Sequence, residues 1–571
     1  MGVLAEQLAS HLSASGALIG FWDVLDEHKD AQLGVSASAR PMLVAARFAS
    51  HPQCSLVIVA GKDASVSFAR QLKAFVGDDK VLHYPERSDL PFRQTKANKS
   101  DISRRMRAQW ALINKEKVIV VASASSLIRY LPPALSLACA PLVLETGLDL
   151  GQMKQSASHL EMKTLDDLCA CLVSLGYENT AHLDGPGTFC TRGGTVDVFP
   201  GNSAFPIRLD FFGDTLDEIR RVVSSLGQTI SSLDKVEIYP VSDFPINEQN
   251  MMKARAGLAL QSELNPALRE LYDLARTGVA FDGSDTLVSY VYDKTQTLGD
   301  YADKGCLVSL VEPKSLIDDA QHAYDEVKEA LAGTKFPMER MFCPSTKLSF
   351  GNALRATYGS FMMQGVLNDQ NLSVKRIDIM GSLEKLHGRL AGLLHMGFKV
   401  VFSLPNAQVR HDIEMDLIDK HLPYSECLEF ESASKTALEP GVINITDVDF
   451  DIGMTMPQAK LALITLHDLR GVSSRMQAKR KVDINNITFA YKPGDYVVHA
   501  VHGVAYFKEM VRRQTEGVER DYLLLEYAEG DKLYVPVEQL DRVTRYVGPE
   551  GSIPRLTRLS SSDWSTMASG G

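Results

Sequence analysis

The sequence predicts a multidomain α/β protein that ends in a small β-rich module. Its 571 residues exceed what one hydrophobic core holds and suggest roughly four or five domains, at about 100 to 150 residues each. In the first half, apolar runs of strand length alternate with helical stretches, which is typical of α/β domains. In the last structured stretch, short apolar runs alternate with turn residues, which favours a β-barrel.

The composition is that of an ordinary soluble globular protein, with 45% hydrophobic and 23% charged residues. A formal net charge of −11 argues against a chain whose main task is to coat DNA. No apolar run reaches the length of a membrane span. The eight cysteines are scattered and show no metal-ligand spacing. We therefore expect reduced thiols and a cytoplasmic location.

Two strand-then-helix repeats open the chain. Ser55–Ala60 (SLVIVA) reads as a buried strand followed by a helix through Phe75, and Lys117–Ala122 (KVIVVA) repeats the pattern before Ser123–Tyr130. Nucleotide sites are often built where such a strand meets its helix.

The nucleotide candidate at the first of these junctions is weak. A phosphate-binding loop needs a glycine five residues before Gly61 and a Ser or Thr after Lys62, but Leu56 and Asp63 stand there. The Asp63 carboxylate would repel phosphate. We expect an ordinary turn and no bound cofactor.

Other catalytic signals are also missing from the sequence. There is no G-x-S-x-G or H-E-x-x-H, and the histidines do not cluster in metal-ligand spacing. The basic run of Arg104, Arg105 and Arg107 could line a cleft, but on a helix it more often forms a solvated face. We predict no catalytic residue and no metal site.

A β-hairpin is predicted between Thr191 and Arg220. Gly193-Gly194 supplies a tight bend, Thr195–Phe199 is a half-buried strand, and Ile207–Phe212 returns as a second strand. Arg192 and Arg208 lie near its two ends.

The arginines of this hairpin can face one surface, beside an aromatic ring. Adjacent strand residues face opposite sides, so we expect Phe212 outside and Phe211 inside. Arginine with an exposed aromatic residue is typical of an interface hot spot. The alternative is that the arginines pair with Asp197 or Asp210 and that both rings fill the core.

The middle of the chain carries less chemistry. Residues 250–348 look mostly helical and should complete the first α/β body. A further α/β unit follows, with no predicted chemistry of its own and a spacer role. Its expected elements are a helix at Leu383–Leu394 and strands at Phe398–Leu404, Val442–Thr446 and Lys460–Thr465.

The stretch from Tyr491 to Tyr546 reads as a bent barrel too small for an enzyme cleft. It holds eight Lys and Arg against ten Asp and Glu, so a protein partner is favoured over nucleic acid. The expected strands are Tyr496–His499, Gly503–Val511, Tyr522–Tyr527 and Lys532–Val537.

The order VVH, HGV, YLLLEY, GDKLYVPV and VTRY in this stretch resembles the polymerase-interacting domain of CarD-type regulators and transcription-repair coupling factors. The resemblance implies that an edge strand binds the β subunit of RNA polymerase. The corresponding positions are Val511, Arg512, Arg513, Gln514 and Thr515. An edge strand offers unpaired backbone groups to a partner. Alternatively, the arginines are solvated residues that stop the edge from pairing.

The hairpin also carries a family pattern. The strings RGGTVDVFP and RLDFFGDTLDEIR are similar to the signature shared by the UvrB subunit of nucleotide excision repair and the coupling factors. In that family this domain binds the damage-recognition protein UvrA. The resemblance carries this role over to Arg192, Arg208 and Phe212.

Together the two signatures resemble the N-terminal half of the transcription-repair coupling factor family. The implied fold is a UvrB-like degenerate RecA-type α/β body with an inserted α+β domain, a further α/β domain, and a C-terminal SH3/Tudor-like barrel. The expected boundaries are 1–152 (degenerate nucleotide-binding-like domain), 153–243 (UvrA-binding domain), 244–365 (remainder of the body), 366–472 (third α/β domain), 473–486 (linker), 487–550 (polymerase-interacting barrel) and 551–571 (tail).

The family continues into two motor domains that hydrolyse ATP with Mg²⁺ and move on DNA, but this chain contains no G-x-x-x-x-G-K-[ST] or D-E-x-[HD]. We expect a fragment that is not itself an enzyme and that joins RNA polymerase to UvrA, with DNA contacted mainly through the motor. Two alternatives remain: an ATP-dependent DNA-processing enzyme of the UvrB/helicase class, and a polymerase-bound regulator with a decayed repair module.

Overall fold

The protein is described here by a computed structural model. It forms two compact units, residues 1–477 and residues 478–571. The predicted linker 473–486 and the tail 551–571, apart from residue 556, lie outside the described residues. The described residues are 3–87, 89, 97–152, 162–222, 229–263, 265–278, 281, 283–334, 336–360, 370–377, 379–380, 383–428, 438–470, 494–499, 503–515, 518–536, 543–545 and 556.

The largest sheet of the described residues has seven strands, each parallel to its neighbours, in the order β15-β1-β14-β13-β2-β4-β3. Its central strands are near-continuous apolar runs because both faces are covered. The strands are β1 (Asp30–Gly34), β2 (Cys54–Val59), β3 (Val81–Tyr84), β4 (Ile119–Ser123), β13 (Cys306–Val311), β14 (Leu354–Gly359) and β15 (Gln370–Asn371).

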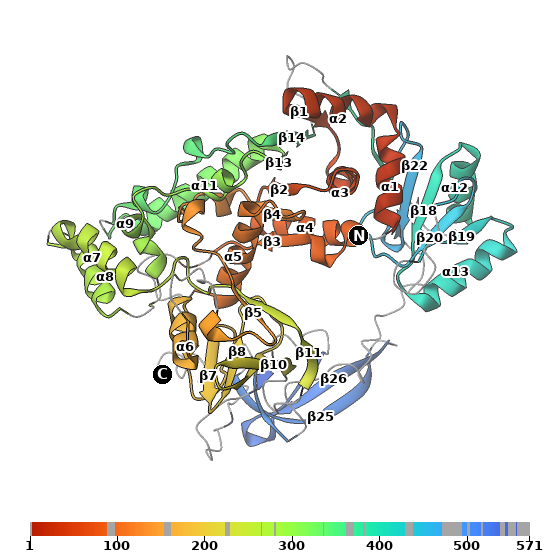
Figure 1. Ribbon diagram of the computed structural model, residues 1–571. Helices are drawn as coiled ribbons and strands as arrows, with labels where there is room; N and C mark the ends of the chain where they lie inside the picture. Colours follow the sequence, from red (N-terminus) through yellow and green to blue (C-terminus); the bar gives the residue numbers. More distant parts are fainter. Residues whose placement is uncertain are drawn as a thin grey trace. The chain divides into compact units, whose positions relative to one another are not determined.

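Alternate residues of β2 enter two different cores, as the period of a strand requires. Val57 and Val59 pack with α1 to α4, whereas Leu56 and Ile58 pack with α5 and α7 to α11. In Figure 1, α1 to α4 lie to the right of the strands of this sheet, and α5, α7, α8, α9 and α11 lie to the left. These helices are α1 (Val3–Ser13), α2 (Gly16–His28), α3 (Arg40–Ser50), α4 (Lys62–Val76), α5 (Lys99–Ile113), α7 (Glu248–Ser262), α8 (Pro266–Arg276), α9 (Val288–Val291), α10 (Leu298–Tyr301) and α11 (Pro313–Leu331).

The stretch Ser123–Tyr130, expected to continue as a helix after β4, forms only the short η3 (Ser125–Leu127). Ser126 Oγ donates to the Ser123 carbonyl at 2.7 Å, and such local bonds compete with a helix. The other 3-10 helices are η1 (Ala37–Ala39), η2 (Asp78–Lys80), η4 (Ala134–Ser136), η5 (Leu150–Gln152), η6 (Ser284–Leu287), η7 (Met338–Arg340), η8 (Ser345–Lys347), η9 (Leu466–Asp468) and η11 (Ala528–Gly530).

A second sheet, of six described strands in the order β11-β10-β9-β8-β7-β6, interrupts the sequence of the α/β body. Its pairs are antiparallel except β6 with β7. Its core includes α6 (Leu165–Ser174). The strands are β6 (Glu178–Asn179), β7 (Thr188–Arg192), β8 (Thr195–Phe199), β9 (Ile207–Phe212), β10 (Thr215–Val222) and β11 (Thr229–Leu233), and β5 (Leu142–Glu145) pairs with β12 (Lys235–Ile238).

The third α/β part has six described strands in the order β16-β21-β22-β18-β20-β19. Its predicted helix and three predicted strands are confirmed as α12, β18, β20 and β22. The elements are β16 (Lys375–Arg376), α12 (Leu383–His395), β18 (Lys399–Ser403), α13 (Ala407–Asp419), β19 (Tyr424–Glu426), β20 (Ile443–Thr446), β21 (Met454–Met456) and β22 (Leu461–Thr465), and β17 (Ile379–Met380) pairs with β23 (Leu469–Arg470).

The second unit holds five described strands in the order β27-β26-β25-β24-β28, each antiparallel to its neighbours. Its core contains Val497, Phe507, Leu523 and Val535. The strands are β24 (Tyr496–His499), β25 (Gly503–Thr515), β26 (Val518–Glu526), β27 (Lys532–Pro536) and β28 (Val543–Arg545).

The predicted mixed α/β class with parallel sheets is confirmed, and closure of the terminal module into a barrel stays a prediction. Within the described part of the chain, no helix is both long and apolar enough to span a bilayer. All eight cysteines are free thiols, as expected.

Candidate partner-binding faces and a buried arginine network

The bend between β7 and β8 depends on two glycines. Gly193 has φ +61°, which favours glycine. A Cβ at Gly194 would lie 2.8 Å from the Phe211 carbonyl oxygen, and the Gly194 carbonyl accepts a 2.8 Å bond from the Phe211 amide. The glycine pair therefore brings β7, β8 and β9 into one register.

That register places Arg192, Arg208 and Phe212 on the same face of the sheet. Cys190 pairs with Asp197, and Asp197 pairs with Arg208, so these three side chains point to one side. Arg192 is two residues from Cys190, and Phe212 is four residues from Arg208, so both keep that side. The three predicted UvrA-binding residues thus share one surface, which the sequence alone left open.

The opposite face of this sheet is the domain core. It consists of fully buried apolar side chains at the intervening positions of β7 to β10. These are Phe189, Val196, Val198, Ile207, Leu209, Leu216 and Ile219. Binary patterning therefore assigns the charged side of the sheet to the exterior.

Phe212 is 85% exposed at the end of β9, whereas Phe211 packs partly buried against the core. The predicted alternation of the two rings is confirmed. A fully solvated phenylalanine gains nothing for the fold, so it is available to enter an apolar pocket on a partner.

Arg208 is held by a two-pronged ion pair with Asp197. Its Nε and Nη2 donate to the two carboxylate oxygens at 2.7 and 2.9 Å. The hydrogen bond with Asp197 raises the pKa of the Arg208 guanidinium. The fork geometry orients the guanidinium plane. The alternative of pairing with Asp197 therefore holds for Arg208, and the paired group still lies on the outer face.

Arg192 is exposed, and its Nη2 lies 3.0 Å from His182 Nδ1. A further pair, Arg220 with Asp210, extends the charged face across β10, with Nη2 2.5 Å from the carboxylate. Arg220 lies directly opposite Arg208 in the register. Arg220 could not be predicted as a neighbour of Arg208 from the sequence, because strand register and not sequence spacing places the two residues together.

The positions Val511, Arg512, Arg513, Gln514 and Thr515 lie at the end of β25. On one side they pair with β26, from Val511 opposite Tyr522 to Thr515 opposite Val518. On the other side β24 reaches only from Gly503 to Tyr506. Among the described strands, none covers the second edge of this segment. Its backbone geometry is therefore that of the predicted edge strand.

At Gly61 the structure has a short turn from β2 into α4. Gly61 adopts φ +88° and caps the helix, and Asp63 lies in the first helical turn. A carboxylate in the first turn of a helix occupies the region where a phosphate would bind, and the expectation of no bound cofactor at this turn stays a prediction.

A buried network of arginines and aspartates lies beyond the carboxyl end of β3. Arg87 Nε and Nη2 donate to Asp89 at 2.9 and 2.5 Å, and Arg87 Nη1 pairs with Asp243. Arg129 pairs with Asp285 and donates to the Asp89 carbonyl at 2.7 Å. The network joins segments more than 150 residues apart, since 156 residues separate Arg87 from Asp243.

The pKa values of Asp89 and Asp285 in this network are shifted in opposite directions. Burial raises the pKa of Asp89, but the hydrogen bond and charge of Arg87 outweigh burial and lower it to about 2. Burial keeps the pKa of Asp285 raised despite Arg87 and Arg129. The network could not be predicted from the sequence, because only the fold brings its residues together and no local spacing signals them.

The prediction that Arg104, Arg105 and Arg107 form a solvated face is wrong for Arg105, which is buried. It is 1% exposed, stacks over the Tyr84 ring with 4.1 Å to the centroid, and donates to the Pro85 carbonyl. Only Arg104 of the run is well exposed, with 49% of its side chain accessible. The helix turns Arg105 inward because position 105 lies on the same face as the core residues Ile102 and Ala108.

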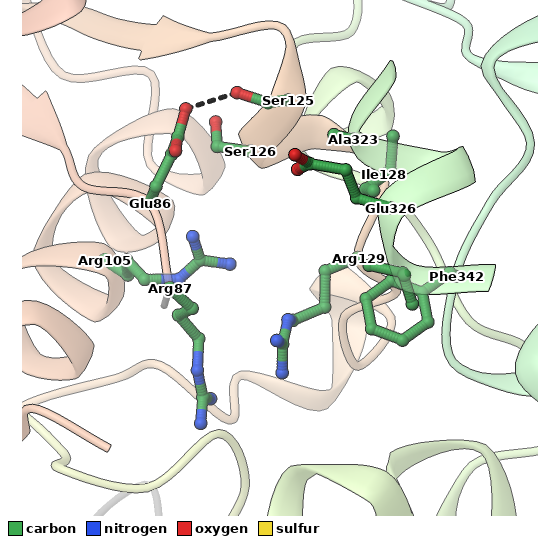
Figure 2. Close-up of a pocket in the computed structure, with 11 residues that line it drawn as sticks. Glu86, Arg87, Arg105, Ser125, Ser126, Ile128, Arg129, Ala323, Glu326 and Phe342 are labelled. Atoms are coloured by element: carbon green, nitrogen blue, oxygen red, sulfur yellow. Dashed lines mark hydrogen bonds between the residues drawn. The ribbon is translucent and has the colours of Figure 1, made fainter. Parts of the chain in front are cut away.

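A cavity of about 270 Å³ adjoins the network. Figure 2 shows Arg105 and Arg129 on its walls together with Glu86 and Glu326. Glu86 accepts a 2.5 Å hydrogen bond from Ser123 Oγ and a second bond from Ser125 Oγ. Carboxylates therefore share the lining with the arginines, and the arrangement favours a structural role over selective anion binding.

Comparison with known families gives two domain matches. Residues 159–244 match the UvrB interaction domain, and residues 491–547 match the CarD-like/TRCF RID domain. The first match contains β6 to β12, with Arg192, Arg208 and Phe212, and the second contains β24 to β28. The predicted resemblance to these two families is confirmed.

Curated relatives named transcription-repair-coupling factor match nearly the whole chain. The Bacillus subtilis protein is 27% identical over 93% of this chain and 46% of its own length. The Mycobacterium tuberculosis protein is 26% identical over 92% and 45%, and the Haemophilus influenzae protein 25% over 89% and 44%. The chain thus spans about half the length of the curated relatives it matches, consistent with their N-terminal half.

Proposed function

We propose that this chain serves transcription-coupled DNA repair as a two-ended adaptor. The sheet face with Arg192, Arg208 and Phe212 binds UvrA, and the open edge of β25 binds the β subunit of RNA polymerase. The observation that carries the proposal is the order of the two matched domains, each containing the residues singled out for its partner. A cytoplasmic location is part of the proposal.

At the UvrA end, binding rests on one flat surface. The Arg208 guanidinium is oriented by Asp197 and keeps 25% of its side chain accessible, while Phe212 is exposed on the same face four residues further along β9. An acidic group of the partner would accept hydrogen bonds from the Arg208 guanidinium, and an apolar pocket of the partner would bind the Phe212 ring. This combination explains why the fold keeps a large apolar side chain in water.

At the polymerase end, binding rests on backbone groups. The segment Val511–Thr515 pairs with β26 along one edge, so a partner strand can add to the other edge. Side chains at alternate positions would then select the partner. Arg513 is the position at which we expect a reversed charge to be least tolerated.

We further propose that this chain by itself does not hydrolyse ATP. Asp63 occupies the place that a phosphate-binding loop gives to Ser or Thr. An ATPase assay of the chain alone tests this, and turnover that disappears with Asp63→Ala or Lys62→Ala would overturn it.

The central test is binding of UvrA and of the polymerase β subunit to three proteins: wild type, Arg192→Ala/Arg208→Ala, and Arg513→Asp. We expect each variant to lose one partner and keep the other. Loss of both partners by a folded variant, or binding of neither partner by wild type, contradicts the adaptor function.

A further inference from the structure

Two cysteines lie side by side across the central parallel sheet. Cys54 opens β2 and Cys306 opens β13, and the two residues are paired in register. Their Sγ atoms are 3.0 Å apart, although 252 residues separate them in the chain. Neighbouring strands lie about 4.8 Å apart, which is within the Cα separation that a disulfide accepts. The backbone therefore needs little movement to join them.

A lysine stands beside one of these thiols. Lys115 Nζ lies 3.4 Å from Cys306 Sγ and donates at 3.2 Å to the Tyr301 carbonyl. The carbonyl bond fixes the ammonium group next to the sulfur. A cation at this distance stabilises a thiolate, which is the reactive form of cysteine.

The charges around the pair favour one thiolate and one thiol. The hydrogen bond with Cys54 lowers the pKa of Cys306 to about 7, burial opposes it, and Lys115 adds to it, while Asp303 acts in the other direction. The same hydrogen bond raises the pKa of Cys54, with Glu116 also raising it. Cys306 is therefore the candidate nucleophile of the pair, and Cys54 is its candidate protonated partner.

The pair lies just inside the amino-terminal edge of the sheet. Both cysteines are buried, but each is the first residue of its strand, and Lys304, Gly305 and Lys115 next to them are exposed. No atom lies within 4 Å of a Cβ built on Gly305. Strand ends are where local opening of a fold costs least, so a small oxidant would reach the pair from this edge.

We propose that Cys54 and Cys306 form a reversible redox site that a hydroperoxide converts into a disulfide. The Cys306 thiolate attacks the peroxide oxygen, the O–O bond breaks, and the leaving alkoxide takes a proton, which leaves a sulfenic acid on Cys306. Cys54 sulfur then attacks that sulfur, the S–S bond forms, and its proton leaves with the hydroxide as water. A dithiol reductant reverses the step by exchange.

The disulfide would tie together the two segments of the α/β body on either side of the UvrB-like sheet. Because the closed loop is long, the cross-link restricts the unfolded chain strongly. Oxidation therefore should raise the thermal unfolding midpoint of the first unit while leaving the charged face of the inserted sheet unchanged.

The test exposes the whole chain to hydrogen peroxide at pH 7.5 and maps its peptides by mass spectrometry without reduction. We expect a linked peptide joining residues 54 and 306 that dithiothreitol removes. In Cys54→Ser, dimedone should trap the sulfenic acid on Cys306. Cys139, a buried thiol whose pKa burial raises to about 12, should stay unmodified as an internal control. Oxidation of Cys139 before the pair, or absence of the linked peptide, overturns the proposal.

Lys115→Met tests the thiolate separately from the distance between the sulfurs. Loss of the Lys115 ammonium group should raise the pKa of Cys306 toward the ordinary range of cysteine. Disulfide formation at pH 7.5 should then be slower by about tenfold. Lys117→Met, at an exposed position two residues along, should oxidise like wild type. Equal rates for both variants would overturn the assigned role of Lys115.

Discussion

Arginine and aspartate form both the charged face of the UvrB-like sheet and the network beyond β3, but the two regions differ in exposure. On the face, the Arg208–Asp197 pair keeps 25% and 10% of its side chains accessible, and Phe212, four residues further along β9, is 85% exposed. In the network, Arg87 and its partners Asp89, Asp243 and Asp285 are each at most 8% accessible.

This difference in exposure suits the charged face to partner binding and the buried network to stabilising the fold. The Arg208–Asp197 pair is only partly exposed, but solvent reaches its guanidinium, so Arg208 can also donate to a carboxylate of a partner. A buried pair cannot be opened cheaply, because removing one charge leaves the other unpaired in a low-dielectric site. The same residue types therefore serve recognition on the sheet and tertiary connection in the body.

The largest expected effect comes from breaking the buried network. Arg87→Met removes one cation from beside three carboxylates and should lower the free energy of unfolding by about 3 to 5 kcal/mol. Denaturant unfolding followed by far-UV circular dichroism measures it. Arg104→Met, which removes an exposed pair with Asp101, is the matched control and should change stability little. Equal losses from both variants would contradict the contrast between the regions.

Acid should weaken the same network. The pKa of Asp89 lies at about 2 in the folded protein, below its unfolded value of about 3.9. Its contribution of roughly 2 kcal/mol is thus present above pH 4 and lost as pH falls toward 2. Unfolding measured across this window, in wild type and Asp89→Asn, checks the effect. In Asp89→Asn the free energy of unfolding should fall less than in wild type between pH 4 and pH 2. The same pH dependence in both proteins would contradict the role of Asp89.

Substitutions on the charged face should change the affinity for UvrA and leave the free energy of unfolding unchanged. Phe212→Ala should weaken UvrA binding by about 2 kcal/mol, or roughly thirtyfold, with an unchanged free energy of unfolding. Its neighbour Phe211→Ala should lower stability instead, because that ring packs on the core. Titration calorimetry with UvrA and denaturant unfolding separate the two outcomes. Loss of stability in Phe212→Ala would place its ring in the fold.

The smallest effect is expected at the Arg220–Asp210 pair. Both side chains are about one quarter accessible, at 28% and 26%, so a double-mutant cycle with Arg220→Gln and Asp210→Asn should give a coupling energy of about 0.2 to 1 kcal/mol. A coupling energy above about 2 kcal/mol would contradict this prediction, because it would be typical of a buried ion pair such as those of the network.

Much of the fold could be predicted because its signals are local. The apolar runs of β2, β4 and β18 and the bend at Gly193-Gly194 each depend on neighbouring residues. The family patterns of the sequence predict binding roles for Arg192, Arg208 and Phe212 without any knowledge of the geometry. Polar positions such as Arg105 were harder, since a charged residue on a helix gives no sign by itself that it faces inward.

Local sequence patterns establish the α/β class, the order of the parts and the alternation that exposes Phe212 and turns Phe211 toward the core. The fold is needed to show that Arg192 and Arg208 share a face, that Arg87 meets Asp243 and Asp285, and that Cys54 contacts Cys306. Strand period and turn chemistry act over a few residues. Register and strand order bring distant segments together, and no local pattern encodes those meetings.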